Sequence, residues 1–243
     1  VKLPRRLIRP PYREIDLANV VSIEPELADA PLPYIREILQ TVGPRLLAVL
    51  ASTRSAPAGA SLPKEIQVFV TEDTPDPPTH MLAVHSRPSH TANTHKVTLL
   101  PIHSIILATH CANLPPLPTP IRGKTPREPP NQPPTTLPVV PINIPSSETF
   151  PPLCTYLYTQ RADQLLATLL PTTPALSGPD PLSVQRSLQN LASKLACENS
   201  AAKLLECAMK VNGVWRNACA LGIHDDKLWS TMNVAWDVIL SAM

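Results

Sequence analysis

The chain has 243 residues, a formal net charge of +2 and 16% charged residues. This length is enough for one domain of ordinary size or two small ones, and the weak net charge gives no global field that would attract nucleic acid or an anionic membrane. The six glycines lie at least nine residues apart, which excludes the glycine-rich loops that hold nucleotide phosphates.

The chain lacks the sequence signals of secreted and membrane proteins. No apolar run reaches the roughly 18 residues of a membrane span. The start VKLPRRLIRPPYRE is basic but has no apolar stretch after it, unlike a signal peptide. Five widely spaced cysteines are typical of reduced thiols rather than of a disulfide framework. We therefore expect a soluble protein of the nucleus or cytoplasm, or of both, and not a secreted one.

Residues 1–33 are predicted to form a basic, proline-rich arm. Six prolines prevent a continuous helix, so the arm is expected to be extended. Its candidate binding residues are Arg5, Arg6, Arg9 and Arg13, because clustered cations attract phosphate groups or an import receptor. A solvated arm without a binding role is the alternative.

Residues 34–62 are predicted to hold short helices and a linker. Apolar residues recur at helical spacing over 34–52, but Gly43 and Pro44 interrupt the pattern, which favours two short helices at an angle. The small residues of 56–62 are typical of a linker.

Residues 63–172 are predicted to form the α+β core. The alternating, β-branched residues 66–70 indicate a strand. The stretch 114–136 has nine prolines in 23 positions and is predicted to be a disordered surface insertion. Pro141 favours an edge position for the last strand. The remaining expected elements are strands at 81–85, 96–100 and 139–144, and helices at 103–113, from Ser146 or Ser147 through Leu157, and at 161–170.

Residues 182–243 are predicted to form a C-terminal α-helical subdomain, which follows a linker at 171–181. Gly222 is expected to end one helix, and Asp225 or Asp226 to cap the next.

Three tryptophans of this subdomain, Trp215, Trp229 and Trp236, are candidate protein-interaction residues because interfaces favour tryptophan. Their helical spacing places them on apolar faces, so packing in the core is the alternative.

Histidines and cysteines raise the question of an enzyme. Six histidines and one cysteine fall within 80–111: His80, His85, His90, His95, His103, His110 and Cys111. Zinc sites usually contain a ligand pair two to four residues apart, and these histidines offer none. Cys111 beside His110, and Cys154 near Tyr156, are sequence neighbours, which does not make a nucleophile and its base. We therefore predict no catalytic, metal or cofactor-binding residues.

Two stretches resemble the BTB/POZ pattern of strand, histidine, short helix, strand and a helix ending in tyrosines. They are VTLLPIHSIILATHCANLP and, after the proline-rich insertion, LPVVPINIPSSETFPPLCTYLYT. The resemblance covers about residues 66–170 and places His103 at the turn histidine of that fold. It implies a small sheet with packed helices and an adaptor-like role.

A second resemblance covers more of the chain. The blocks ETFPPLCTYLYTQR, LLATLLP and, above all, VNGVWRNACALGIHDDKLWSTMNVAWDVIL are similar to the fungal clampless family, regulators of sexual development in mushrooms and smuts. The resemblance implies a protein without enzymatic activity that binds mating-type or developmental transcription factors and so controls clamp-cell formation and the dikaryon cell cycle.

Together these patterns predict an α+β protein with a BTB/POZ-like core and a helical subdomain, acting by protein–protein interaction. We expect no cofactor, no membrane association and no direct sequence-specific DNA binding, and a homodimer is possible. The alternatives are a Cys- or zinc-dependent hydrolase and a generic BTB-type adaptor for a ubiquitin ligase.

Overall fold

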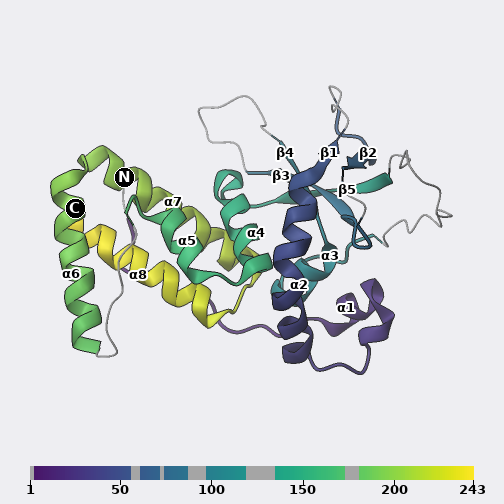
Figure 1. Cartoon of the computed structure of the whole chain (residues 1–243), viewed down its shortest axis with the longest axis horizontal. Helices are drawn as coiled ribbons and strands as arrows, with labels where there is room; N and C mark the ends of the chain where they lie inside the picture. The colour runs from purple at the N-terminus through teal and green to yellow at the C-terminus, as the bar shows by residue number, and fades with distance from the viewer. Residues whose placement is uncertain (1–2, 56–60, 72–73, 87–96, 119–134, 173–180) are drawn as a thin grey trace. The chain divides into compact units, whose positions relative to one another are not determined.

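The computed structural model describes residues 3–55, 61–71, 74–86, 97–118, 135–172 and 181–243 (Figure 1). It is an α+β protein with one five-stranded mixed sheet and eight α-helices in these residues. Several sequence predictions fall outside them: most of the linker at 56–62, Lys96, the greater part of the insertion at 114–136, and most of the linker at 171–181.

The chain divides into two compact units. The sheet unit comprises Arg13–Ser147 and Leu157–Gln160. The helical unit is discontinuous and comprises Val1–Tyr12, Glu148–Tyr156 and Arg161–Met243. Helix α4 (Phe150–Thr159) contributes residues to both units.

The sheet unit begins with two short elements inside the predicted arm. Helix α1 (Leu17–Ile23) starts at Asp16, whose carboxylate accepts a hydrogen bond from the Ala18 N–H at 3.0 Å, and a 3-10 turn (Pro25–Leu27) follows. Asp is a favoured N-cap because it satisfies an amide that the helix leaves unpaired. The prediction of an extended arm is therefore wrong for these residues, since the prolines lie outside α1 and do not interrupt it.

Helix α2 (Leu32–Ser52) is continuous, which contradicts the predicted break at Gly43 and Pro44. Proline removes one helical hydrogen bond but leaves the later ones intact. Gly43 has a packing role, because a Cβ atom at this position would lie 2.9 Å from the backbone carbonyl carbon of Tyr158 and closer still to its oxygen. The glycine lets α2 approach the backbone of α4 closely.

The five strands are ordered β1-β2-β5-β3-β4. Strands β2 (Glu65–Val70), β3 (His80–His85) and β4 (Thr98–Ile102) match the predicted strands to within two residues, whereas β1 (Thr53–Ser55) was not predicted. β3 and β4 pair antiparallel, and β3 and β5 (Thr135–Asn143) pair parallel. Ile66, Val68, Met81 and Leu137 form a buried cluster on this sheet.

The prediction that the strand with Pro141 lies at an edge is wrong, because β5 lies between β2 and β3. β5 also begins at Thr135, inside the predicted insertion. The prolines of β5 are tolerated because its two partner strands, β2 and β3, pair with different parts of it. Among the described strands, Pro138 is paired only with β2, and Pro141 only with β3. Each proline therefore lies where the strand has one neighbour, so no ladder on its second side is interrupted.

Helix α3 (Ser104–His110) follows β4 directly and is mostly buried. The backbone N–H groups at its start are satisfied by side chains of the sheet unit. The His103 N–H donates to the Tyr158 hydroxyl at 2.7 Å, and the Ser104 N–H donates to the Thr79 hydroxyl at 2.8 Å. The first turn of α3 is thereby capped by side chains from elsewhere in the sequence.

The helical unit contains α5 (Ala162–Leu169), α6 (Pro181–Glu198), α7 (Ala201–Leu221) and α8 (Asp226–Ala242), and Figure 1 shows α8 lying among the others. Gly222 ends α7 with φ 67° and ψ 40°, a left-handed conformation that glycine adopts without strain. The Asp225 carboxylate caps α8 by accepting from the Leu228 N–H at 2.8 Å. Both predicted helix boundaries are confirmed.

None of the helices in the described part of the chain has the length and apolar character needed to cross a membrane.

Candidate protein-interaction surface

Two of the three candidate tryptophans lie in the core of the helical unit. Trp229 and Trp236 are seven residues apart on α8 and are 3% and 1% exposed. The Trp229 indole N–H donates to the Ile223 carbonyl at 2.9 Å, whereas that of Trp236 has no acceptor among the described residues. Burial of this kind stabilises the fold. It leaves little of the Trp236 ring for a partner to contact, whereas the Trp229 ring is covered in part by Arg9 of the chain's own N-terminal segment.

Trp215 differs from the other two because it is half-buried on α7. Its indole N–H donates to the backbone carbonyl of Ile8 at 3.0 Å, across 207 residues of sequence. The Cys219 thiol, one turn further along α7, lies 3.9 Å from the same carbonyl oxygen. Trp215 therefore holds the extended N-terminal segment, residues 3–12, against the C-terminal helices.

The four arginines of the predicted arm have different environments. Arg9 forms an ion pair with Asp226 at 2.6 Å, and its guanidinium carbon lies 5.6 Å from the centre of the Trp229 ring. Arg13 belongs to the sheet unit, where it donates to the Asn113 side chain at 3.0 Å. Arg5 and Arg6 are exposed. The structure thus brings Arg9 together with Trp229, but not the four arginines with one another.

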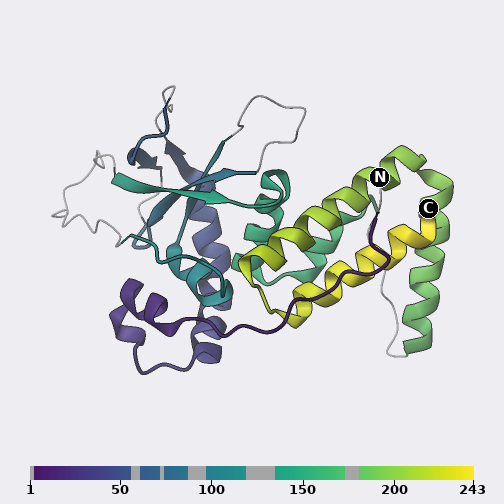
Figure 2. The same ribbon diagram turned by 180° about the vertical axis from the view of Figure 1, so that it is seen from behind.

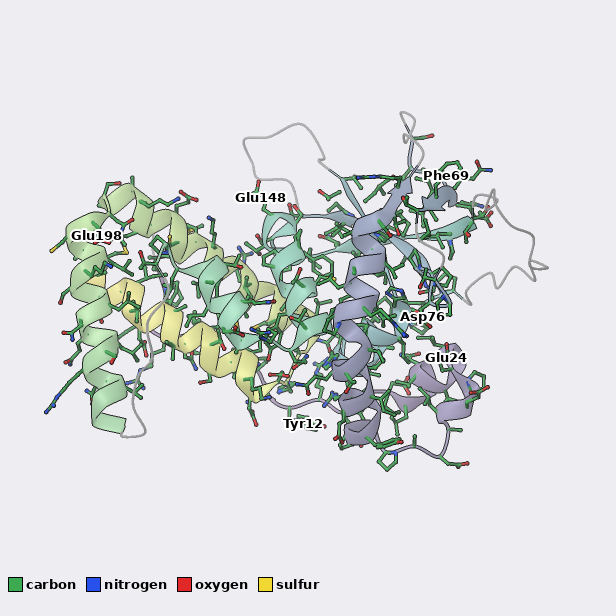
Figure 3. The ribbon with its side chains drawn as sticks, in the orientation of Figure 1. Tyr12, Glu24, Phe69, Asp76, Glu148 and Glu198 are labelled. Carbon is green, nitrogen blue, oxygen red and sulfur yellow. The ribbon has the colours of Figure 1, made fainter. Side chains whose placement is uncertain are left out.

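Two further residues complete the contact of the N-terminal segment. The Tyr12 ring meets the His224 ring edge-on, with ring centroids 5.1 Å apart, near the start of α8 (Figure 3). Leu7 is buried. We call the residues that receive this segment the docking surface: Trp215, Cys219, His224, Asp226 and Trp229.

Sequence reasoning missed His224, Asp226 as a partner of Arg9, and Tyr12. No local pattern indicates these contacts, because they join residues about 200 positions apart. One sequence feature could have indicated the contact: the chain starts with basic residues, and acidic residues lie beside the tryptophans near its end.

Asp225 links α8 to α4 within the helical unit. Its carboxylate accepts both from the Leu228 N–H and from the buried Tyr156 hydroxyl, each at 2.8 Å. Burial and the neighbouring negative charge of Asp225 raise the pKa of Tyr156, so this side chain stays protonated and donates. The residue that caps the helix therefore also fixes a core tyrosine.

Three of the five thiols do not have the electrostatics of a nucleophile. Burial raises the pKa of Cys154 to about 12, and it also raises the pKa values of Cys207 and Cys219. A catalytic thiol requires the opposite shift, because the thiolate is the reactive form. The described residues thus offer no activated cysteine at these three positions.

The histidines have structural partners. His80 is buried, with one ring nitrogen 2.8 Å from the Pro118 carbonyl, and His103 reaches the Asp76 carbonyl at 3.1 Å. Burial lowers the pKa values of both. Within the described ranges, no three His, Cys, Asp or Glu side chains converge as a metal site requires. His90 and His95 lie outside those ranges.

Two family models match the chain. The model of the Clampless protein 1 N-terminal domain matches residues 10–145, and the model of the Clampless protein 1 C-terminal domain matches residues 163–243. No curated protein and no solved structure matched the chain. The docking surface lies inside the second range, whereas Leu7 and Arg9 lie before the first.

Proposed function

The chain belongs to the Clampless protein 1 family, and we propose that it is a regulator without enzymatic activity that binds transcription factors during fungal sexual development. Family membership fits a role in clamp formation in fungal development. The proposal adds the mode of action, which is protein binding in the nucleus or cytoplasm.

The observation that carries this proposal is that the N-terminal and C-terminal domain models of one family both match the chain, in that order. The site chemistry is consistent with it. The thiols at 154, 207 and 219 have raised pKa values, the buried histidines are held by carbonyl groups, and the helical unit already binds an extended stretch of polypeptide.

We also propose that the sheet unit is BTB/POZ-like. Its support is the order of elements: β4, then His103, then the buried helix α3, then β5 parallel to β3, then α4, whose Tyr158 belongs to this unit. An adaptor role for a ubiquitin ligase would follow from the same architecture and is an outcome of the experiment below.

The test is affinity purification of the full chain from fungal cells in sexual development. We expect mating-type transcription factors in near-stoichiometric amounts. The Asp226→Lys variant probes the docking surface, because this aspartate side chain is 90% exposed and its replacement should leave the fold intact. Lys194→Ala, at an exposed position of α6, is the matched control.

The outcomes of this purification are distinct. Loss of the transcription factors with Asp226→Lys but not with Lys194→Ala would locate the binding surface on α8. Recovery of a ubiquitin ligase scaffold instead would favour the adaptor. If no protein partner is recovered reproducibly, the proposal of a binding regulator is wrong. Light scattering of the purified chain checks the predicted possibility of a homodimer.

Direct DNA binding is expected to be weak. Arg9 is paired with the Asp226 carboxylate, which offsets its charge, so Arg5, Arg6 and Arg13 are the arginines of the predicted arm that could contact phosphate groups. Titration with duplex DNA at two salt concentrations tests this, because binding that depends on phosphate contacts weakens steeply as salt increases. Tight, salt-resistant binding to one DNA sequence would contradict the expectation.

A further inference from the structure

The N-terminal segment is held by side chains and not by secondary structure. Residues 3–12 form neither helix nor strand, and Figure 2 shows them running alongside α8. Their contacts with the C-terminal helices include hydrogen bonds from Trp215 and Cys219 to the Ile8 carbonyl, an ion pair, a cation–π contact and an edge-on ring contact. Surface contacts of this kind are individually weak, so the segment is bound reversibly.

The side chains of the segment alternate between buried and exposed, as in an extended peptide that lies on a surface. Leu7 is buried and Arg9 faces Asp226 and Trp229, whereas the Ile8 side chain between them is 75% exposed. In extended backbone, successive side chains point to opposite sides, so residues two apart contact the same surface. The bound segment thus presents a buried apolar residue and, two positions later, an arginine that contacts the docking surface.

The chemistry of the docking surface matches that pattern. An exposed carboxylate, Asp226, and an aromatic face, Trp229, together bind a guanidinium, and the indole N–H of Trp215 recognises a backbone carbonyl that any peptide carries. None of these groups requires that the peptide be the chain's own.

We propose that the docking surface is a binding site for an extended basic segment of a partner protein with the pattern Leu-x-Arg, and that residues 3–12 occupy it as a displaceable internal competitor. This inference rests on the proposed function as a protein-binding regulator, and it supplies the surface and the chemistry of the bound segment. The partner must displace the N-terminal segment, so binding is restrained until a stronger segment is present.

The extent to which the N-terminal segment weakens the binding of an added peptide can be calculated. A tethered segment has an effective concentration on the order of 1 mM. If the isolated segment binds with a dissociation constant of about 50 μM, the site is open about one twentieth of the time, and a peptide added in trans binds about 20-fold more weakly to the wild type than to a chain with a disabled segment.

The experiment uses a fluorescein-labelled peptide, LPRRLIRPPYR, and measures its fluorescence anisotropy with the full chain. In the segment variant, Leu7→Ser is combined with Arg9→Glu, which removes the apolar anchor and reverses the charge facing Asp226. We expect this variant to bind the peptide about 20-fold more tightly than the wild type. Thermal unfolding verifies that both proteins are folded.

Matched controls separate recognition from general charge attraction. A peptide with Arg9→Ala is expected to lose at least about tenfold in affinity, whereas the Arg5→Ala peptide should change by less than about threefold, because Arg5 is exposed. Both peptides lose one positive charge. Adding Asp226→Asn to the segment variant removes the carboxylate without creating a partner for the glutamate at position 9, and should weaken peptide binding by at least about tenfold, whereas Lys194→Ala should leave it unchanged.

Three results would overturn the inference. The first is a folded segment variant that does not bind the peptide. The second is equal peptide affinity of the segment variant and the wild type. The third is an equal loss of affinity for the Arg9→Ala and Arg5→Ala peptides. A wild type that is dimeric by light scattering, together with a monomeric segment variant, would identify a second copy as the occupant and refute the internal competitor. Recovery of transcription factors without peptide binding would leave the proposed function intact and reject only this surface.

Discussion

Replacing Gly43 by alanine tests whether the close approach of α2 to α4 determines the stability of the sheet unit. A Cβ atom at position 43 would lie 2.9 Å from the carbonyl carbon of Tyr158, and real Cβ atoms essentially never come within 3.0 Å of such a neighbour. The obstructing atoms belong to the backbone, so no rotation of a side chain relieves the clash. The two helices must separate or the backbone must distort.

Two effects of this substitution have opposite signs. Alanine is favoured over glycine inside a helix by about 1 kcal/mol, which would stabilise the variant. Overpacking a buried site costs about 1–3 kcal/mol, and more where backbone must move, as at Gly43. Movement of Tyr158 also strains its 2.7 Å hydrogen bond from the His103 N–H. We expect a net destabilisation of about 2–4 kcal/mol, or a decrease in Tm of about 5–15 °C.

Urea unfolding followed by far-UV circular dichroism measures this change. Tryptophan fluorescence is unsuitable as the main probe, because Trp215, Trp229 and Trp236 all belong to the helical unit. Ala48→Gly, at an exposed position of α2, is the control and should cost about 1 kcal/mol through helix propensity alone. If Gly43→Ala is more stable than the wild type, the close approach does not limit stability and the reasoning is wrong.

Three further predictions concern buried polar groups. Trp229→Phe should destabilise the protein by about 1 kcal/mol more than Trp236→Phe, because only the Trp229 indole N–H has a described acceptor; equal urea midpoints would contradict this. Asp225→Ala should lower the free energy of unfolding by about 2–4 kcal/mol, because it removes a helix cap and the acceptor of the Tyr156 hydroxyl. Asp225→Asn should lower it much less, and thermal unfolding of the two variants measures the difference. The pKa values of His80 and His103 are lowered by burial, so these histidines bind protons more readily in the unfolded chain than in the folded one as the pH falls. The free energy of unfolding should therefore be constant above about pH 6.5 and decline between about pH 6.5 and 5.5. A flat profile would exclude buried neutral histidines.

The elements that the sequence predicted correctly are those decided by neighbouring residues. Gly222 and Asp225 mark helix ends because a left-handed glycine and an aspartate cap act within one turn. The strand at 66–70 follows from its own alternation, since Ile66 and Val68 are buried while the residues between and beside them are not. The resemblance to the clampless family is likewise confirmed, because it rests on residue identities.

The predictions that failed depended on distant residues. Gly43 interrupts a helical pattern in sequence, yet in the structure it allows contact with Tyr158, which lies 115 positions later. Pro141 indicates an edge strand by the usual rule, but the stagger of β2 and β3 along β5 gives it a one-sided position within the sheet. The docking surface could not be predicted for the same reason. Trp215 and Trp229 could be nominated from the sequence, but their partners Ile8 and Arg9 could not be assigned to them.

The discontinuity of the helical unit has a consequence for how the protein is made. Residues 3–12 leave the ribosome early, but the groups that receive them, from Trp215 to Trp229, are synthesised more than 200 residues later. At about 5–20 residues per second, the segment waits on the order of 10–40 s with Leu7 uncovered. During that interval the whole sheet unit is synthesised, because it lies in sequence between the N-terminal segment and Arg161–Met243, so the N-terminal segment can dock only as one of the last events of folding.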